Sequence, residues 1–106
     1  MTLERVMDEI HKWYDQTSKR YSDKIKFELA QNEKDFLLVY LETNRYIAEL
    51  TVENPGFHPH RFVSFVVLEL DKNPQQKPIY SYYDSDKDSI NDIIEQLNNG
   101  ITFITK

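Results

Sequence analysis

The chain has 106 residues, enough for one domain and too few for two, so we predict a single domain spanning residues 1–106. Its formal net charge of −5 argues against a nucleic-acid partner and fits a neutral or basic protein partner. The absence of cysteine excludes disulfides and thiolate metal sites, and seven Tyr and six Phe exclude a disordered chain.

The beginning of the chain carries charged side chains and does not form the apolar core of a signal peptide. Glu4, Arg5, Asp8 and Glu9 interrupt the first ten residues. No apolar run in the sequence reaches membrane-spanning length. We therefore expect a cytoplasmic protein with no membrane partner.

Residues 2–21 are predicted to form an amphipathic helix. Thr2 can act as its N-cap, and Glu4 lies in the first turn, where the helix dipole favours a carboxylate. Apolar residues recur at spacings of three and four and form one stripe. The stripe consists of Leu3, Val6, Met7, Ile10, Trp13, Tyr14 and Thr17.

Residues 24–31 alternate between apolar and polar side chains, which is typical of an edge strand with one wet face. Phe27 and Leu29 are expected to face the core. Because side chains alternate along a strand, this facing requires an odd-numbered connection to the next strand, such as residues 32–34.

Residues 35–52 read as a β-hairpin that turns at Thr43 and Asn44, which places Glu42 opposite Arg45. One face of this hairpin is apolar apart from a tyrosine hydroxyl, and we expect it to face the core. It carries Leu37, Val39, Leu41, Tyr46, Ala48, Leu50 and Val52. The other face is mixed, and carries Phe36, Leu38, Tyr40, Ile47, Glu49 and Thr51.

Two further strands are predicted at residues 61–71 and 78–83, separated by polar loops at residues 53–60 and 72–77. Both sides of the first of these strands are largely apolar, so it should lie centrally in the sheet. We expect one side of it to extend the mixed face of the hairpin. That side carries Val63, Phe65 and Val67, with Tyr80 and Tyr82 bordering it.

A second helix is predicted at residues 85–99, with Ser85 or Asp86 as its cap and Gly100 in the left-handed position after its end. Residues 101–106 are expected to add a short strand. The predicted fold is therefore α+β, in the order α-β-β-β-β-β-α. Because each helix has one apolar stripe, a five-stranded antiparallel meander would have both helices packed on one face.

The face opposite the helices is the main functional candidate, since its apolar patch would be larger than a monomer usually leaves bare. A homodimer, another protein, or the chain's own loop or C-terminal tail could each cover it. For a protein partner, tyrosines are favoured at interfaces. The predicted apolar contacts are Phe36, Leu38, Tyr40, Phe65, Tyr80 and Tyr82.

The acidic stretch 84–95 admits two interpretations. Asp84, Asp86 and Asp88 could steer a basic partner. The stretch also fits several ligand positions of an EF-hand calcium loop, but Ser89 occupies the position that needs glycine. Because a helix and a metal loop cannot share these residues, we favour an acidic helix start.

Metal, cofactor and catalytic signatures are weak throughout the sequence. His58 and His60 could supply two metal ligands, but two histidines alone specify no site, so we assign no metal and no cofactor. Small-ligand or metal binding by the loop at 53–60 remains the alternative function. No nucleophile motif or phosphate-binding loop is present, which predicts a protein that is not an enzyme.

Three stretches carry a resemblance to a known family: LLVYLETNRYIAELTV, VVLELDKNP and PIYSYYDSDKDSINDIIEQL. In their order and pattern they resemble the TriTu family of bacterial immunity proteins from polymorphic toxin systems. The three stretches lie between residues 37 and 97 of the 106-residue chain. It implies a small cytoplasmic α+β protein that binds and neutralises a cognate toxin.

Overall fold

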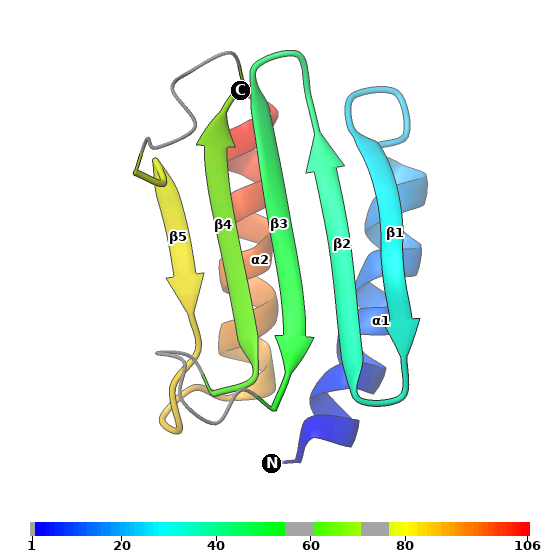
Figure 1. Cartoon of the computed structure of the whole chain (residues 1–106), viewed down its shortest axis with the longest axis vertical. Coiled ribbons are helices and arrows are strands. Elements are labelled where there is room, and N and C mark those ends of the chain that lie inside the picture. Colours follow the sequence, from blue (N-terminus) through cyan, green and yellow to red (C-terminus); the bar gives the residue numbers. More distant parts are fainter. Residues whose placement is uncertain (1, 55–60, 71–76) are drawn as a thin grey trace.

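A computed structural model describes residues 2–54, 61–70 and 77–106, which form two helices and one antiparallel sheet. The strands are hydrogen-bonded in chain order, β1-β2-β3-β4-β5, so the sheet is a meander (Figure 1). This confirms the predicted α+β class and element order. The elements are α1 (Leu3–Arg20), β1 (Lys26–Glu33), β2 (Phe36–Glu42), β3 (Tyr46–Glu53), β4 (Val63–Glu69), β5 (Tyr80–Tyr83) and α2 (Ile90–Ile104).

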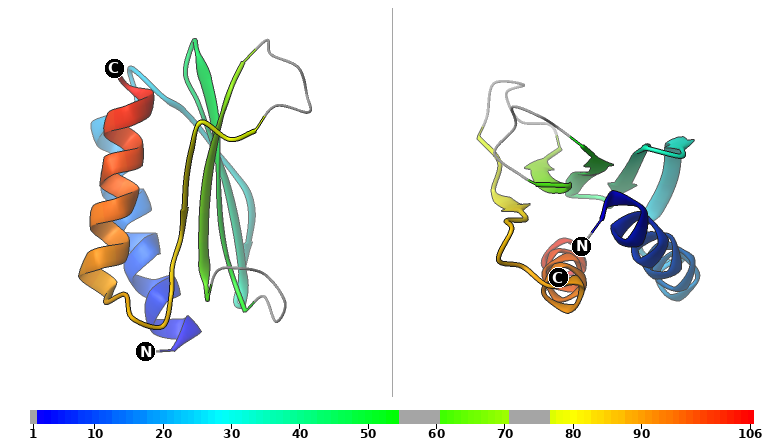
Figure 2. Two further views of the ribbon diagram at one scale, coloured as in Figure 1. Left: turned by 90° about the vertical axis from the view of Figure 1, so that its left-hand side faces the viewer. Right: turned by 90° about the horizontal axis from the view of Figure 1, so that it is seen from below.

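Both helices lie on the same side of the sheet, as the apolar stripes predict (Figure 2). One hydrophobic core fills the space between the two layers. The sheet contributes residues such as Leu37, Leu50 and Phe65, and the helices contribute residues such as Ile10 and Leu97. Burial of this apolar surface is the main source of stability in a domain of this size. The other side of the sheet carries no described helix.

Helix α1 begins and ends where the sequence indicates. Thr2 is the N-cap, and its Oγ1 accepts a hydrogen bond from the Arg5 backbone N–H at 3.2 Å. The predicted stripe is buried or half-buried along its whole length. Trp13 anchors α1 to α2, because its indole N–H donates to Asn98 Oδ1 at 2.8 Å. A buried indole N–H needs such a partner.

Strand β1 reaches the expected facing by a different route from the predicted odd loop. Glu33 pairs with Phe36, so the connection is a two-residue loop. A β-bulge at Ala30 then shifts the register, and Leu29 pairs with Val39. One extra residue in a strand reverses the faces on one side of the bulge. Phe27 and Leu29 therefore face the helix side, although Leu29 is 42 % exposed at this edge.

The β2–β3 hairpin has the predicted faces but not the predicted pairs. Glu42 pairs with Ile47, and the Thr43 N–H donates to the Tyr46 carbonyl at 2.9 Å. The turn is therefore centred on Asn44 and Arg45, and the predicted pair of Glu42 with Arg45 is wrong. The register differs by two residues. Because side chains alternate with a period of two, this shift leaves every residue on its predicted face.

Helix α2 lies five residues later than predicted at each end. Its N-cap is Ser89, in a capping box with Asp92, so residues 85–88 form a connecting segment. Gly100 does not end the helix, because α2 continues to Ile104. Gly100 is buried and packs against the ring of Phe65. Residues 101–104 continue the helix, so the predicted C-terminal strand is wrong. This segment lies in the helix layer and does not cover the opposite face of the sheet.

The predicted facing of β4 and β5 is wrong. Phe65 pairs with Leu50 and is fully buried under the helices, and its neighbour across the sheet is Tyr82. Tyr80 and Tyr82 point to the same side and pack against the core. The prediction had placed these three aromatic side chains on or beside the opposite face. Ser64, Val66, Leu68, Ser81 and Tyr83 occupy that face instead.

Candidate functional site

The side of the sheet that faces away from α1 and α2 is the candidate functional site, and we call it the outer face. Its apolar side chains come from four adjacent strands, β2 to β5. The apolar members are Phe36, Leu38, Tyr40, Ile47, Val66, Leu68 and Tyr83. Most are half-buried, and Tyr83 is 41 % exposed. The described helices are both on the other side of the sheet (Figure 2).

Carboxylates lie among and around these apolar residues on the outer face, and Glu49 lies between Tyr40 and Val66 on the central strand. The strand register places five of them there: Glu28, Glu33, Glu42, Glu49 and Glu53. Lys26 is the one basic strand residue on the same face. Within the described parts of the chain, no ion pair involves these six side chains. Among the described strand residues, the outer face therefore combines apolar side chains with more carboxylates than basic groups.

A shallow depression lies at the β1–β2–β3 end of the outer face. It has a volume of about 190 Å³. Tyr40 lies between Glu28, its cross-strand neighbour, and Glu42, two residues along the same strand. Ile47 pairs with Glu42 from the other side. The lining residues are Lys26, Glu28, Tyr40, Glu42 and Ile47.

The predicted apolar contacts are divided between the two sides of the sheet. Phe36, Leu38 and Tyr40 lie on the outer face, as predicted. Sequence reasoning missed Val66 and Leu68. No polarity signal distinguished the two sides of β4, because Ser64 lies on one side and Glu69 on the other. In β5, by contrast, Ser81 was a signal, because it makes its side of the strand more polar than the side of Tyr80 and Tyr82.

Tyr80 and Tyr82 connect β5 to α2 and to the segment that precedes it. The Tyr80 hydroxyl donates to the Gln96 carbonyl at 3.0 Å, and the Tyr82 hydroxyl donates to Asp88 Oδ2 at 2.8 Å. Burial raises the pKa of both phenols above the usual value of 10.0, and for Tyr82 the hydrogen bond to Asp88 adds to this effect. Both hydroxyls are thus engaged in structural contacts inside the molecule.

Asp84, which was predicted to steer a partner, is a buried structural residue and only 1 % exposed. Its Oδ1 accepts hydrogen bonds from the backbone N–H groups of Arg61, Phe62 and Val63, at 3.0, 2.8 and 2.8 Å. It fixes the chain that enters β4 against the chain that leaves β5. Its Oδ2 has no hydrogen-bond partner in the described residues. A side chain enclosed in this way does not project charge toward a partner.

Asp86 and Asp88 lie in the connecting segment before α2 and have different environments. Asp86 is exposed, whereas Asp88 accepts hydrogen bonds from the Tyr82 hydroxyl and the Ser85 N–H. Helix α2 begins at Ile90. A helix over the later ligand positions excludes an EF-hand loop here. In the described residues, no group of three or more His, Asp or Glu side chains could hold a metal ion.

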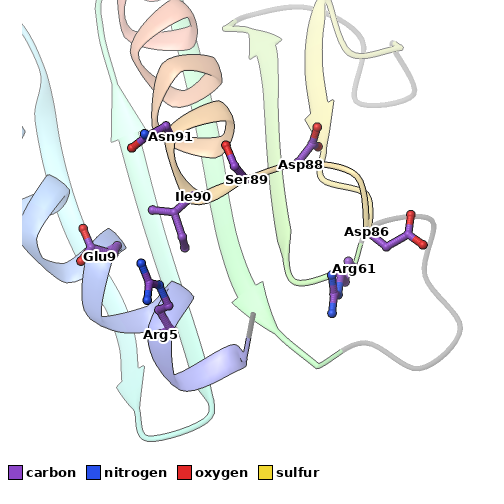
Figure 3. Close-up of a pocket in the computed structure, with 8 residues that line it drawn as sticks. All are labelled: Arg5, Glu9, Arg61, Asp86, Asp88, Ser89, Ile90 and Asn91. Carbon is purple, nitrogen blue, oxygen red and sulfur yellow. The ribbon is translucent and has the colours of Figure 1, made fainter.

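A larger pocket, of about 540 Å³, lies between the N-terminal ends of α1 and α2 (Figure 3). Arg5 points up between the helices from α1, while Arg61 and Asp86 lie on the far side of the pocket. Asp88 already accepts a hydrogen bond from the Tyr82 hydroxyl. The Ser89–Asp92 capping box already provides hydrogen-bond acceptors for backbone N–H groups at the N-terminus of α2. The charged groups do not converge on one point, so this pocket defines no chemistry.

The two histidines considered as metal ligands, His58 and His60, lie outside the described residues, because they belong to the segment 55–60. The alternative of ligand binding by the loop at 53–60 therefore stays a prediction. None of the described helices is long and apolar enough to cross a membrane.

Comparisons with protein-family models, with curated proteins and with solved structures found no match to this chain. The resemblance to the TriTu family therefore rests on the residue pattern alone. Any assignment of function must come from the surfaces of the molecule itself.

Proposed function

We propose that this chain is a non-enzymatic protein-interaction module that binds a protein partner through its outer face. One observation carries the proposal: an apolar surface built from four strands lies on the side of the sheet opposite both helices. Groups of large apolar side chains at a protein surface mark interaction sites in soluble proteins. The carboxylates on β1 and at the ends of β2 and β3 would form the polar rim that such interfaces have, whereas Glu49 lies inside the surface.

The specific form of this proposal is an immunity-type inhibitor that acts in the cytoplasm and neutralises a toxin. The resemblance to the TriTu family supports it. The acidic balance of the chain also supports it, because a negative surface accelerates association with a basic protein.

We favour a different protein over a second copy of this chain as the partner. A symmetric face-to-face dimer would bring the five glutamates of one outer face against the five of the other. Like charges placed across an interface oppose association. We therefore expect light scattering to give the monomer mass of 12.7 kDa. A stable dimer that persists at low salt would contradict this.

The test compares variants on the two sides of the sheet. The double variant Leu38→Asn and Leu68→Asn makes the outer face polar without changing its charge. The matched control is Leu29→Asn, which alters an exposed leucine on the helix side of β1. Tagged proteins are expressed in the cells of origin, and the captured proteins are quantified by mass spectrometry. Wild type and control should share a partner that the double variant loses.

Affinity and growth measurements complete the test. The identified partner should bind the double variant at least about tenfold more weakly, which corresponds to about 1.4 kcal/mol. If the partner is a toxin, its expression should arrest growth and co-expression of this chain should restore it. Equal binding by wild type and double variant, with both folded, would rule out the outer face as the binding surface.

A further inference from the structure

The depression at Tyr40 combines an aromatic ring with carboxylates from two neighbouring strands. Glu28 lies directly across from Tyr40, and Glu42 follows it on the same face of β2. The ring of Tyr40 is half-buried, whereas Glu28 and Glu42 are exposed. An aromatic face between two carboxylates attracts a cation, because the ring quadrupole and the two negative charges act in the same direction.

The two glutamates at this depression are available for a partner. Neither forms an ion pair within the described portion of the molecule. Lys26 lies opposite Glu42, but no contact within 4.0 Å joins their charged groups. Lys26 offsets one of the two carboxylates that line the depression, so the described lining keeps an excess of one negative charge.

The size of the depression selects the kind of ligand. Its volume of about 190 Å³ is below the roughly 300–1,000 Å³ typical of small-molecule sites. It suits one side chain of a larger partner. Arginine fits better than lysine, because a planar guanidinium can stack on an aromatic ring and still form paired hydrogen bonds with carboxylates.

We propose that the Tyr40 depression, flanked by Glu28 and Glu42, receives an arginine side chain from a basic protein partner bound to the outer face. This inference rests on the proposed function and specifies the chemistry of the partner. The apolar residues of the outer face would supply contact area, and the arginine would fix the register of the complex. The charge complementarity lies on the outer face itself and not in the acidic stretch 84–88, where Asp84 is buried.

The test uses two short peptides as probes, acetyl-Leu-Arg-Leu-amide and acetyl-Leu-citrulline-Leu-amide. Citrulline has nearly the same shape as arginine but carries no charge. Each peptide is titrated into the isotopically labelled full chain, and amide chemical shifts are followed by NMR. The arginine peptide should produce saturable shifts at Lys26, Glu28, Glu42 and Ile47. It should bind at least tenfold more tightly than the citrulline peptide.

Two variants check that the carboxylates are responsible. The double variant Glu28→Gln and Glu42→Gln keeps the shape of the depression and should weaken binding of the arginine peptide at least tenfold. The control Glu95→Gln removes an exposed carboxylate from α2 and should leave binding unchanged. Equal binding of both peptides, no binding of either, or shifts centred on Asp86 and Asp88 would each overturn the proposal.

These outcomes are separate from those that test the proposed function. If the arginine probe fails but the apolar variants still abolish partner binding, the outer face is the interface and only the arginine site is wrong. If the apolar variants leave partner binding intact, the proposed function fails whatever the peptides do.

Discussion

Asp84 shows how one carboxylate can organise a junction of the chain. Three consecutive backbone N–H groups donate to its Oδ1, and two of them, at Phe62 and Val63, belong to buried residues. Buried donors without partners are costly, whereas several charge-assisted bonds to one carboxylate are favourable. The residue is thus more important for the fold than for binding.

Replacing Asp84 with alanine should therefore destabilise the protein strongly. We expect Asp84→Ala to lower the free energy of unfolding by about 3 kcal/mol, because buried N–H groups lose their acceptor. Asp86→Ala, two residues away and exposed, should change it by less than about 0.5 kcal/mol. Urea unfolding measures both. Equal effects of the two substitutions would refute the structural role of Asp84.

Gly100 is present for packing and not for backbone freedom. A Cβ at this position would lie 3.0 Å from Cδ1 and Cζ of Phe65, and closer still to Cε1. The Phe65 ring is fully buried and cannot move aside freely. The missing side chain is what allows α2 to approach β4.

We expect Gly100→Ala to lower the free energy of unfolding by about 1–2 kcal/mol, even though alanine is the better helix former by about 1 kcal/mol. Overpacking against Phe65 should outweigh the gain in helix propensity. Asn99→Ala, at the neighbouring exposed position, should be neutral or slightly stabilising, because only propensity acts there. Urea denaturation separates the two. A stabilised Gly100→Ala variant would contradict the close contact.

Tyr82 links stability to alkaline pH. Burial, and then its hydrogen bond to Asp88, hold the pKa of the folded-state phenol above the usual 10.0. In the unfolded chain the phenol ionises near pH 10. The unfolded state therefore loses this proton first as the pH rises, and the contribution of Tyr82 to stability is present below pH 10 and declines above it.

Thermal unfolding from pH 8 to pH 11 tests this linkage. The melting temperature of Tyr82→Phe should be lower than that of wild type at pH 8, because the bond to Asp88 is lost. Above pH 10 it should decline less steeply than that of wild type, because phenylalanine does not ionise. Parallel pH profiles for the two proteins would show that Tyr82 does not contribute.

At the scale of elements, strand facing was the hardest feature to predict. The periodicity of α1 and the alternation of β2 and β3 indicated their buried sides correctly. The facing of β4 could not be derived from β3, because the loop between them has no turn signal that fixes an even or odd length. The facing of β1 depended on a bulge at Ala30, for which the sequence gives no clear signal.

The bulge leads to a prediction about deletions. Removing Ala30 should leave a regular ladder in which Leu29 still pairs with Val39 and every core residue keeps its face. We expect this deletion to change the free energy of unfolding by no more than about 1 kcal/mol. Deleting Glu49 from the central strand β3 would reverse the faces on one side of the gap and should prevent folding. Circular dichroism and urea unfolding distinguish these outcomes, and an unfolded Ala30 deletion would contradict the assigned bulge.

At the scale of the whole molecule, the sequence predicted the layers but only part of the binding surface. Two helices with one apolar stripe each, and a sheet with two faces, can be packed in few ways, and the more apolar face of β2 and β3 indicated which face the helices cover. The composition of the outer face was less predictable, because it depends on the register of all five strands at once. Phe36, Leu38 and Tyr40 were placed correctly, whereas the facing of Phe65, Tyr80 and Tyr82 was inverted.

The molecule therefore has a helix side that maintains the fold and an acidic and apolar outer face that we propose for binding. Hydroxyl-radical labelling of the chain, free and in complex with its captured partner, tests this division most directly. We expect the partner to protect Tyr40, Ile47 and Leu68 from labelling and to leave Tyr21 and Phe103 on the helix side unchanged. Protection of Tyr21 and Phe103, with Tyr40, Ile47 and Leu68 labelled as in the free chain, would contradict it.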